Sequence, residues 1–323
     1  MALFTRLEAA ALAEIAARFS LGSVQRAEPL AAGTINSNFS VETATGHWFV
    51  RVNEGKAQDD VAWEAALVEA LAAGGVTTPP PMPATDGRPY APLGTTGKWV
   101  SVFPWRAGHH LDATAVTKHA VHELGVALGE LHRVGLELPA AWRRPSIYDH
   151  DHLVARHAGF SALPDPVLSP AIPLLAEALT FAGERTAIRQ RATHGIIHGD
   201  LFRDNVLWEA DRLVAILDFE QASGGSLVYD LAVCINDWCW TGEPRLELVG
   251  ALLDGYRSRR ALSEADRAAL PIEVRAAAAR FTITRITDVY LARVPNPDKD
   301  FRAFLARCEA WKGPALGQLS SLL

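Results

Sequence analysis

The most informative segment of this sequence reads HGDLFRDN and spans His198–Asn205. Apolar runs flank it, Gly195–Ile197 before and Val206–Trp208 after, and both favour strands. A further strand-like run, Leu213–Leu217, ends directly at Asp218. The sequence therefore predicts a polar loop between strands, with another carboxylate at the end of the next strand.

Three side chains of this region have the types that phosphoryl transfer from ATP requires. In kinases a loop Asp accepts the proton of the substrate hydroxyl, while a loop Asn and a later Asp hold metal ions. Asp200, Asn205 and Asp218 occur in that order, and their oxygens suit Mg²⁺. The alternative is a polar loop in which Asp and Asn serve only turn chemistry. Because all three occur together in sequence order, phosphoryl transfer is favoured.

The segment resembles the aminoglycoside-phosphotransferase-like branch of the protein-kinase superfold, in which the loop reads H-G-D rather than H-R-D. Within this branch the chain is most similar to the homoserine kinase family. The matching stretches are Asn36–Phe39, Asp200–Leu207, Leu217–Phe219, Tyr229–Ala232 and Asn236–Cys239. The resemblance extends over essentially the whole chain, although the branch contains many substrate specificities.

The resemblance implies a two-lobed α+β fold. Residues 1–104 are expected to form a nucleotide-binding lobe with a small antiparallel sheet and one helix. Residues 105–323 are expected to form a mainly helical catalytic and substrate-binding lobe, with ATP between the lobes and a hinge near residue 105. The implied reaction uses ATP and Mg²⁺ to phosphorylate the hydroxyl of L-homoserine, giving O-phospho-L-homoserine in threonine biosynthesis.

Helical periodicity predicts helices over most of the remaining chain. Their expected ranges are 6–19, 59–73, 113–133, 148–160, 167–190, 244–259, 264–291 and 298–319, with another helix starting at 227. A turn is expected at Gly224–Gly225.

The bulk composition excludes several classes of protein. The 323 residues are 49% hydrophobic and carry a net charge of −6 without a Lys/Arg-rich run, which argues against nucleic acid as a partner. The three cysteines form no metal-like pair and suggest a reducing compartment. No apolar stretch is long enough to span a membrane, and no secretory signal is visible. We therefore expect a cytoplasmic protein with a small-molecule substrate; oligomeric state is not indicated.

The resemblance places a nucleotide-covering loop at residues 32–41, where Gly33, Ser37 and Asn38 are candidate contacts to phosphate. Glycine and small polar residues between strands can bring backbone N–H groups close to phosphates. The segment has one glycine rather than the three of a G-x-G-x-x-G loop, so a simple hairpin turn is the alternative.

A strand over residues 47–52 carries Arg51 at the position where protein kinases have a phosphate-contacting Lys. Glu64 on the following helix is the expected partner, with Glu69 as an alternative. An Arg is not equivalent to a Lys at such a site. Lys56 is a possible substitute, and an exposed strand Arg is the simpler interpretation of Arg51.

The hinge is expected at residues 103–108, where Phe103 and Trp105 could contact the adenine ring. Packing in an apolar core would explain both rings equally well.

Residues of the second lobe supply candidates for loop support and substrate binding. We expect His198 and Asp230 to support the catalytic loop and Arg203 to steady a phosphate. Asp237 could hold the ammonium of an amino-acid substrate and Arg285 its carboxylate. The alternatives are helix-terminal or solvated acids for Asp230 and Asp237, and a surface arginine for Arg285.

Two other functions stay open. The first is a related kinase acting on an aminoglycoside, a choline-like alcohol or a methylthioribose-like sugar. The second is a non-catalytic nucleotide-binding or regulatory module, for which the replaced Lys is the only support.

Overall fold

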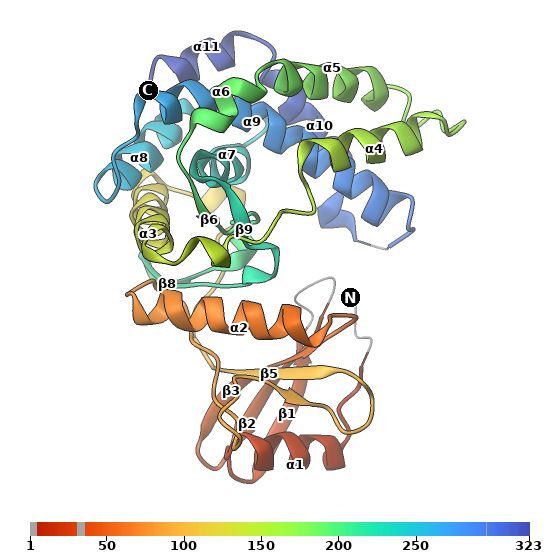
Figure 1. Cartoon of the computed structure of the whole chain (residues 1–323), viewed down its shortest axis with the longest axis vertical. Coiled ribbons are helices and arrows are strands. Elements are labelled where there is room, and N and C mark those ends of the chain that lie inside the picture. The colour runs from red at the N-terminus through yellow and green to blue at the C-terminus, as the bar shows by residue number, and fades with distance from the viewer. Residues whose placement is uncertain (1–4, 31–35, 295) are drawn as a thin grey trace. The chain divides into compact units, whose positions relative to one another are not determined.

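The structure is a computed structural model of the chain, and it describes residues 5–30, 36–294 and 296–323. Two compact units make up the chain (Figure 1). The first comprises Met1–Gly108 with Val214–Glu220, and the second comprises His109–Leu213 with Gln221–Leu323. The first break lies close to the boundary expected at residues 104 and 105, but the sequence did not predict the return of Val214–Glu220 to the first unit.

The first unit contains a five-stranded antiparallel sheet in the order β1-β2-β3-β5-β4. Two helices accompany it and lie on opposite sides of the sheet (Figure 1). The bounds are α1 Ala9–Arg18, β1 Val24–Leu30, β2 Ser37–Thr43, β3 Gly46–Asn53, α2 Gln58–Ala73, β4 Ala91–Pro92 and β5 Trp99–Pro104.

Alternation along β3 gives the sheet one apolar and one polar face, because successive side chains of a strand point to opposite sides. Val50 and Val52 belong to the buried core that includes side chains of α1. Arg51, between them, is in register with Asn38 of β2 and Ser101 of β5. The strand pattern therefore directs Arg51 to the face opposite α1.

The second unit is mainly helical. Its helices are α3 Lys118–Glu137, α4 His150–Ser161, α5 Ala171–Glu184, α6 Thr186–Arg191, α7 Leu227–Trp238, α8 Leu246–Arg257, α9 Glu264–Arg285, α10 Phe301–Ala310 and α11 Pro314–Ser320. The longest of these, α9, begins with a capping box in which Ser263 and Asp266 satisfy each other's backbone N–H groups.

Helices α3 and α8 pack closely because glycines face the contact. A Cβ atom on Gly125 would collide with the main-chain oxygen of Leu252, and one on Gly255 would collide with that of His122. The close packing keeps α3 fixed, and α3 carries a residue that supports the loop described below.

Strand β6, His194–Ile197, pairs antiparallel with β9, Ser223–Ser226. The expected turn at Gly224–Gly225 was wrong, because both glycines lie within β9. Strands β7, Val206–Glu209, and β8, Arg212–Ile216, form a two-stranded sheet, and the chain passes from the second unit to the first within β8.

The predicted α+β class is confirmed, with an antiparallel sheet in the N-terminal part and a mainly helical remainder. The range expected to form one helix at 264–291 is α9 followed by a π-helical turn at Ile286–Tyr290. Within the described residues, no helix combines the length and the apolar character needed to cross a membrane.

Candidate active site

The loop His198–Asn205 lies in the second unit directly after β6, and Asp230 of α7 holds its first residues. Asp230 Oδ2 accepts a hydrogen bond from His198 N at 2.7 Å, and Oδ1 accepts one from Gly199 N at 2.8 Å. The Nε2 atom of His132 lies 3.0 Å from Asp230 Oδ2. Because Asp230 and His132 are completely buried, this network fixes the start of the loop.

The hydrogen bonds of His132 determine its tautomer. Burial lowers the pKa of His132, so its ring is neutral and carries one N–H group. Asp230 can only accept, so Nε2 donates to it, and Nδ1 accepts from the hydroxyl of Tyr256 at 2.8 Å. Arg260 Nη1 donates to that hydroxyl at 3.1 Å. Arg260, Tyr256 and His132 thus form a chain of hydrogen bonds, each donated in the direction of Asp230.

Gly199 is the one position of the loop that requires glycine. Its φ is +79°, a conformation that L side chains rarely adopt, and a Cβ atom would lie 3.0 Å from the main-chain oxygen of Gln221. The glycine of the H-G-D sequence is therefore required by the backbone conformation, whereas the aspartate is required by the proposed chemistry.

Asp200 follows with its side chain 25% exposed. Its Oδ1 atom lies 3.7 Å from Arg280 Nη1. Burial raises the pKa of Asp200, while the charges of Arg280 and Lys299 act against that rise. A partly exposed carboxylate with a raised pKa can orient a hydroxyl and accept its proton.

Arg280 of α9 is buried and held on several sides. Its Nη1 atom donates to the main-chain oxygen of Gly199 at 3.2 Å. Its guanidinium carbon lies 4.1 Å from the ring centroid of Tyr148 and 3.9 Å from that of Phe281. Arg280 is thus a fixed positive charge beside Asp200.

Asn205 ends a 3-10 turn, Arg203–Asn205, and its Nδ2 atom donates to the main-chain oxygen of Asp200 at 2.7 Å. This bond orients the amide, because only the nitrogen can donate. No described residue hydrogen-bonds to Asn205 Oδ1, so an amide oxygen is available as a metal ligand.

Asp237 has a partner within the second unit. Its Oδ2 accepts from the backbone N and Nε of Arg203, at 2.9 and 3.1 Å, and its Oδ1 accepts from Nη2 at 3.3 Å. Asp237 therefore fixes Arg203 next to the loop, and binding of a substrate ammonium by Asp237 stays a prediction.

Arg285, the last residue of α9, is half-buried. Its Nη1 atom donates to the main-chain oxygen of Asp300 at 3.1 Å, and its guanidinium carbon lies 4.4 Å from the ring centroid of Phe304. Burial lowers the pKa of Arg285, and the carboxylates of Asp237 and Asp200 act against this. The side chain therefore lies within the electrostatic reach of the loop.

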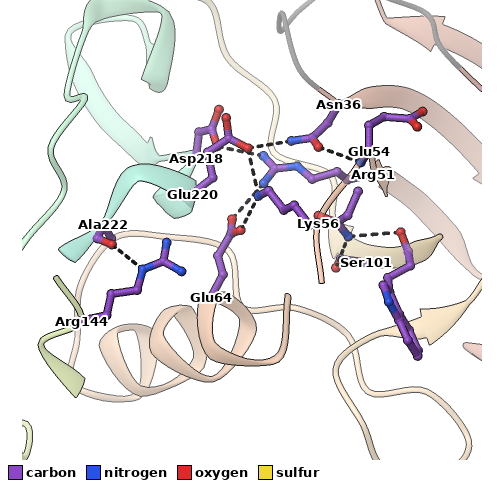
Figure 2. Close-up of polar contacts among 12 residues, drawn as sticks. Asn36, Arg51, Glu54, Lys56, Glu64, Ser101, Arg144, Asp218, Glu220 and Ala222 are labelled. Carbon is purple, nitrogen blue, oxygen red and sulfur yellow. Dashed lines mark hydrogen bonds and ion pairs between the residues drawn. The ribbon is translucent and has the colours of Figure 1, made fainter. Parts of the chain in front are cut away.

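The first unit contains a second cluster of charged groups (Figure 2). Arg51 Nη1 donates to Glu64 Oε1 at 2.9 Å, and Lys56 Nζ lies 2.9 Å from both Glu64 Oε2 and Glu220 Oε2. Asn36 Nδ2 donates to the same Glu220 oxygen at 2.8 Å. The expected Arg51–Glu64 pair is thus present, and Lys56 shares its acid.

Asp218 joins this cluster through Arg51, whose Nη2 atom lies 3.5 Å from Asp218 Oδ1. Its φ is +63°, a region that few non-glycine residues adopt and that often marks functional sites. Burial raises its pKa to about 7, although the charge of Arg51 opposes the rise. Two basic side chains here face three carboxylates, Asp218, Glu64 and Glu220, so the cluster has an excess of negative charge.

The Oδ1 atom of Asp218 tests whether this cluster suits a metal ion. It is buried and has no hydrogen bond within the described residues. Arg51 lies 3.5 Å from this oxygen without a hydrogen bond to it. A buried carboxylate oxygen that lacks a hydrogen bond is costly, and a divalent cation would coordinate this oxygen and offset the negative charge of the cluster. The residues of the first unit therefore fit a bound Mg²⁺.

The remaining nucleotide-binding candidates of the first unit have protein partners. Ser37 and Asn38 lie within β2, not in the loop expected from the sequence, and Ser37 Oγ accepts from Thr5 N at 3.0 Å and donates to Glu54 at 2.7 Å. Gly33 lies outside the described residues.

Both aromatic candidates at the end of β5 also have packing partners. The ring of Trp105 stacks on His47 with centroids 4.1 Å apart, and Phe103 packs against Phe49 with centroids 6.1 Å apart. Each ring therefore packs within the first unit, and its contact with adenine stays a prediction.

Two charged contacts could not be found from the sequence. Arg280 lies beside Asp200, and Glu220 contacts both Lys56 and Asn36. Both contacts join segments far apart in sequence, so no local pattern could indicate them.

Comparison with known proteins identifies the family. Residues 26–262 match the model of the phosphotransferase enzyme family. The homoserine kinase of Methylobacterium radiotolerans is 32% identical over 298 residues, covering 89% of this chain and 88% of that protein.

Solved structures support the fold. An amicoumacin kinase in complex with AMP-PNP, Ca²⁺ and amicoumacin has a TM-score of 0.72 at 14% identity, covering 94% of this chain and 93% of that one. A microcompartment-associated aminopropanol kinase has a TM-score of 0.71 at 21% identity, covering 97% and 100%. The chain belongs to the phosphotransferase enzyme family and, within it, to the homoserine kinases.

Proposed function

We propose that this protein transfers the γ-phosphoryl group of ATP to the hydroxyl of L-homoserine. The observation that carries the proposal is the fixed loop His198–Asn205, which presents the Asp200 carboxylate and the Asn205 amide oxygen. The homoserine kinases that resemble this chain over 89% of its length support the choice of acceptor. The nucleotide in the amicoumacin kinase structure supports ATP as the donor.

Asp200 orients the acceptor hydroxyl and takes its proton. The raised pKa of Asp200 makes it a stronger base than a solvated carboxylate. Asp230 holds the loop by accepting from the backbone N–H groups of His198 and Gly199, and His198 Nδ1 accepts from Asp200 N at 3.3 Å. Their role is therefore to position Asp200.

Asn205 and Asp218 serve as Mg²⁺ ligands, each supported by contacts within its own unit. Asn205 has an oriented amide oxygen, and Asp218 has a buried oxygen without a donor. When bound, Mg²⁺ neutralises charge on the phosphates.

Arg51 and Lys56 supply the positive charge for the nucleotide phosphates, and Glu64 holds both in place. Glu64 contacts Arg51 with one carboxylate oxygen and Lys56 with the other. Arg51 and Lys56 together take the place of the single phosphate-binding lysine of protein kinases. A further cation for the phosphate is Arg203, which Asp237 fixes beside the loop.

The free, buried state of Cys234, Cys239 and Cys308 is compatible with the cytoplasmic location that the composition suggests.

An ADP-release assay with a panel of acceptors tests the proposal. The panel contains homoserine, serine, threonine, choline and kanamycin, each with ATP and Mg²⁺, and the product is checked for an O-phospho ester. We expect the highest kcat/KM with homoserine. A higher value with choline or kanamycin would reassign the acceptor, and ATP binding without transfer to any alcohol would contradict the enzyme assignment.

A further inference from the structure

Three arginines lie next to the catalytic loop of the second unit. Arg203 pairs with Asp237, whose charge also acts on Arg285 and Arg307. Arg285 and Arg307 also share one ring, with guanidinium carbons 4.4 Å from the centroid of Phe304 in each case. The charges of Asp200, Asp204 and Asp300 act on Arg285 as well, so its suitability for an anionic group depends on its hydrogen-bond donors and not on an excess of positive charge.

Two of these arginines are each held through two nitrogens of the guanidinium. Arg203 donates to Asp237 from Nε and Nη2, and buried Arg307 donates from Nε and Nη1 to the main-chain oxygens of Asn236 and Ala303. Arg285 differs, because within the described residues only its Nη1 atom has a hydrogen-bond acceptor, the main-chain oxygen of Asp300. The half-buried fork of Arg285 therefore keeps donors for a ligand.

Ring contacts connect Arg285 to the catalytic loop. Its guanidinium carbon lies 4.4 Å from the ring centroid of Phe304, and the Phe304 ring lies 5.7 Å from that of Phe202 in the loop. The charge of Asp200 also acts on Arg285. In extended L-homoserine the hydroxyl oxygen lies about 5 Å from the carboxylate carbon, so an acceptor held at Asp200 directs its carboxylate away from Asp200 by about this distance.

The substrates named for two relatives of this chain differ in whether they carry a carboxylate. An aminopropanol kinase acts on an amino alcohol, whereas homoserine carries a carboxylate in addition. A chain that prefers homoserine needs a cation for this group, since a buried carboxylate without a partner is strongly disfavoured.

Resting on the function proposed above, we propose that Arg285 binds the α-carboxylate of the acceptor and thereby makes the enzyme select an amino acid over an amino alcohol. The guanidinium fork offers two parallel donors to the two carboxylate oxygens. Phe304 fixes the guanidinium plane.

The test measures kcat/KM of two enzymes with each of two acceptors. Wild type and Arg285→Met are assayed with L-homoserine and with 3-aminopropan-1-ol, which is homoserine without its carboxylate. We expect wild type to prefer homoserine by on the order of 10²-fold in kcat/KM. Arg285→Met should lose on the order of 10²-fold with homoserine, mainly through KM, and less than about threefold with 3-aminopropan-1-ol.

Two further variants distinguish the effect of the positive charge of Arg285 from that of its paired donors and from a general loss of folding. Arg285→Lys keeps a point charge without the fork, so we expect a loss between those of wild type and Arg285→Met. Arg302→Met is the matched control, because Arg302 also contacts a ring, that of Phe301 at 4.9 Å, and also bonds Asp300, but its side chain is 57% exposed. It should change neither acceptor's kcat/KM by more than about twofold.

The possible outcomes separate this inference from the proposed function. Equal losses of Arg285→Met with both acceptors, or no loss with homoserine, would overturn the role of Arg285 while leaving homoserine as the acceptor. A wild type that does not phosphorylate homoserine would remove both. If Arg285→Met does not fold, a wild-type preference below about tenfold, or an unchanged KM in Arg285→Lys, would still overturn the inference.

Discussion

Asp218 in the first unit and Asp200 in the second face similar neighbours but are held differently. Each has an arginine nitrogen within 4 Å of its Oδ1 atom, Arg51 at 3.5 Å and Arg280 at 3.7 Å, and burial raises the pKa of both. Asp218 has a strained backbone and a buried oxygen without a hydrogen bond in the described structure. In the loop around Asp200, in contrast, the backbone N–H groups of His198 and Gly199 bond to Asp230, and that of Asp200 bonds to His198.

The two carboxylates are therefore suited to different ligands. The surroundings of Asp218 leave negative charge uncompensated, which is suited to a cation. The surroundings of Asp200 fix the backbone and leave the carboxylate partly exposed, which is suited to a small hydroxyl compound. The four predictions below test this contrast, from the largest expected effect to the smallest.

Asp200→Ala should have the largest effect on turnover. Removing the base is expected to lower kcat with homoserine by roughly 10²- to 10⁴-fold. Asp204→Ala, which removes a neighbouring acid of the same loop, is the control and should retain kcat within about threefold. Turnover of Asp200→Ala close to that of wild type would remove Asp200 from the mechanism.

Lys56→Met should have the largest effect on stability. It leaves Glu64 and Glu220 with fewer cations in a cluster that is largely buried, so we expect the free energy of unfolding to fall by about 2–4 kcal/mol. Lys312, which pairs with Glu177 and Glu309 on the surface, offers the control Lys312→Met with little change expected. Chemical denaturation measures both variants, and similar midpoints would contradict the buried network.

Asp218→Asn should lower activity less than Asp200→Ala does and should stabilise the protein. The folded pKa of about 7 exceeds the ordinary value of about 3.9, so between these values the folded state holds a proton that the unfolded state has lost. Stability therefore falls as pH rises through this window, and the loss is complete above pH 7. Asparagine avoids this cost and accepts a positive φ.

We expect Asp218→Asn to gain about 1–3 kcal/mol in free energy of unfolding at pH 8 and almost nothing near pH 4. Unfolding curves of both proteins at the two pH values measure this difference. A variant less stable than wild type at pH 8 would show that the Arg51–Asp218 pair outweighs the burial cost.

Arg280→Gln should move the acid limb of the pH profile. The positive charge of Arg280 holds the pKa of Asp200 down against the effect of burial, so its removal raises that pKa further. Less Asp200 is then ionised at a given acidic pH, and kcat/KM should fall at a higher pH than in wild type. Lys299, His198 and Asp204 also act on Asp200 and are unchanged in the variant.

Arg302→Gln is the control for this profile, and its acid limb should coincide with that of wild type. An acid limb of Arg280→Gln that stays in place or moves to lower pH would show that Arg280 does not act on Asp200.

The fold class was predictable because local patterns carry it. Apolar runs predicted the strands next to the loop, helical spacing located the helical segments, and the H-G-D loop pointed to the architecture. Helical spacing did not show that the ranges 167–190 and 298–319 each contain two helices. Errors arose where local signals were ambiguous, as at Gly224–Gly225, where glycines that usually mark a turn lie in β9.

Of the site, the sequence singles out Asp200, Asn205 and Asp218 by residue type and order, and their joint role stays a prediction. The charged neighbours Arg280 and Lys56 could not be assigned from the sequence, since each meets its acid only through the fold. Asp237 illustrates this: nothing in the sequence indicates that Arg203 bonds to both of its oxygens.

Calorimetric titration with AMP-PNP, with and without Mg²⁺, tests the division of roles between the two carboxylates most directly. The account predicts that Asp200→Ala binds AMP-PNP with the wild-type dependence on Mg²⁺, whereas Asp218→Ala loses that dependence. Loss of the Mg²⁺ dependence in Asp200→Ala, or its retention in Asp218→Ala, would contradict the account.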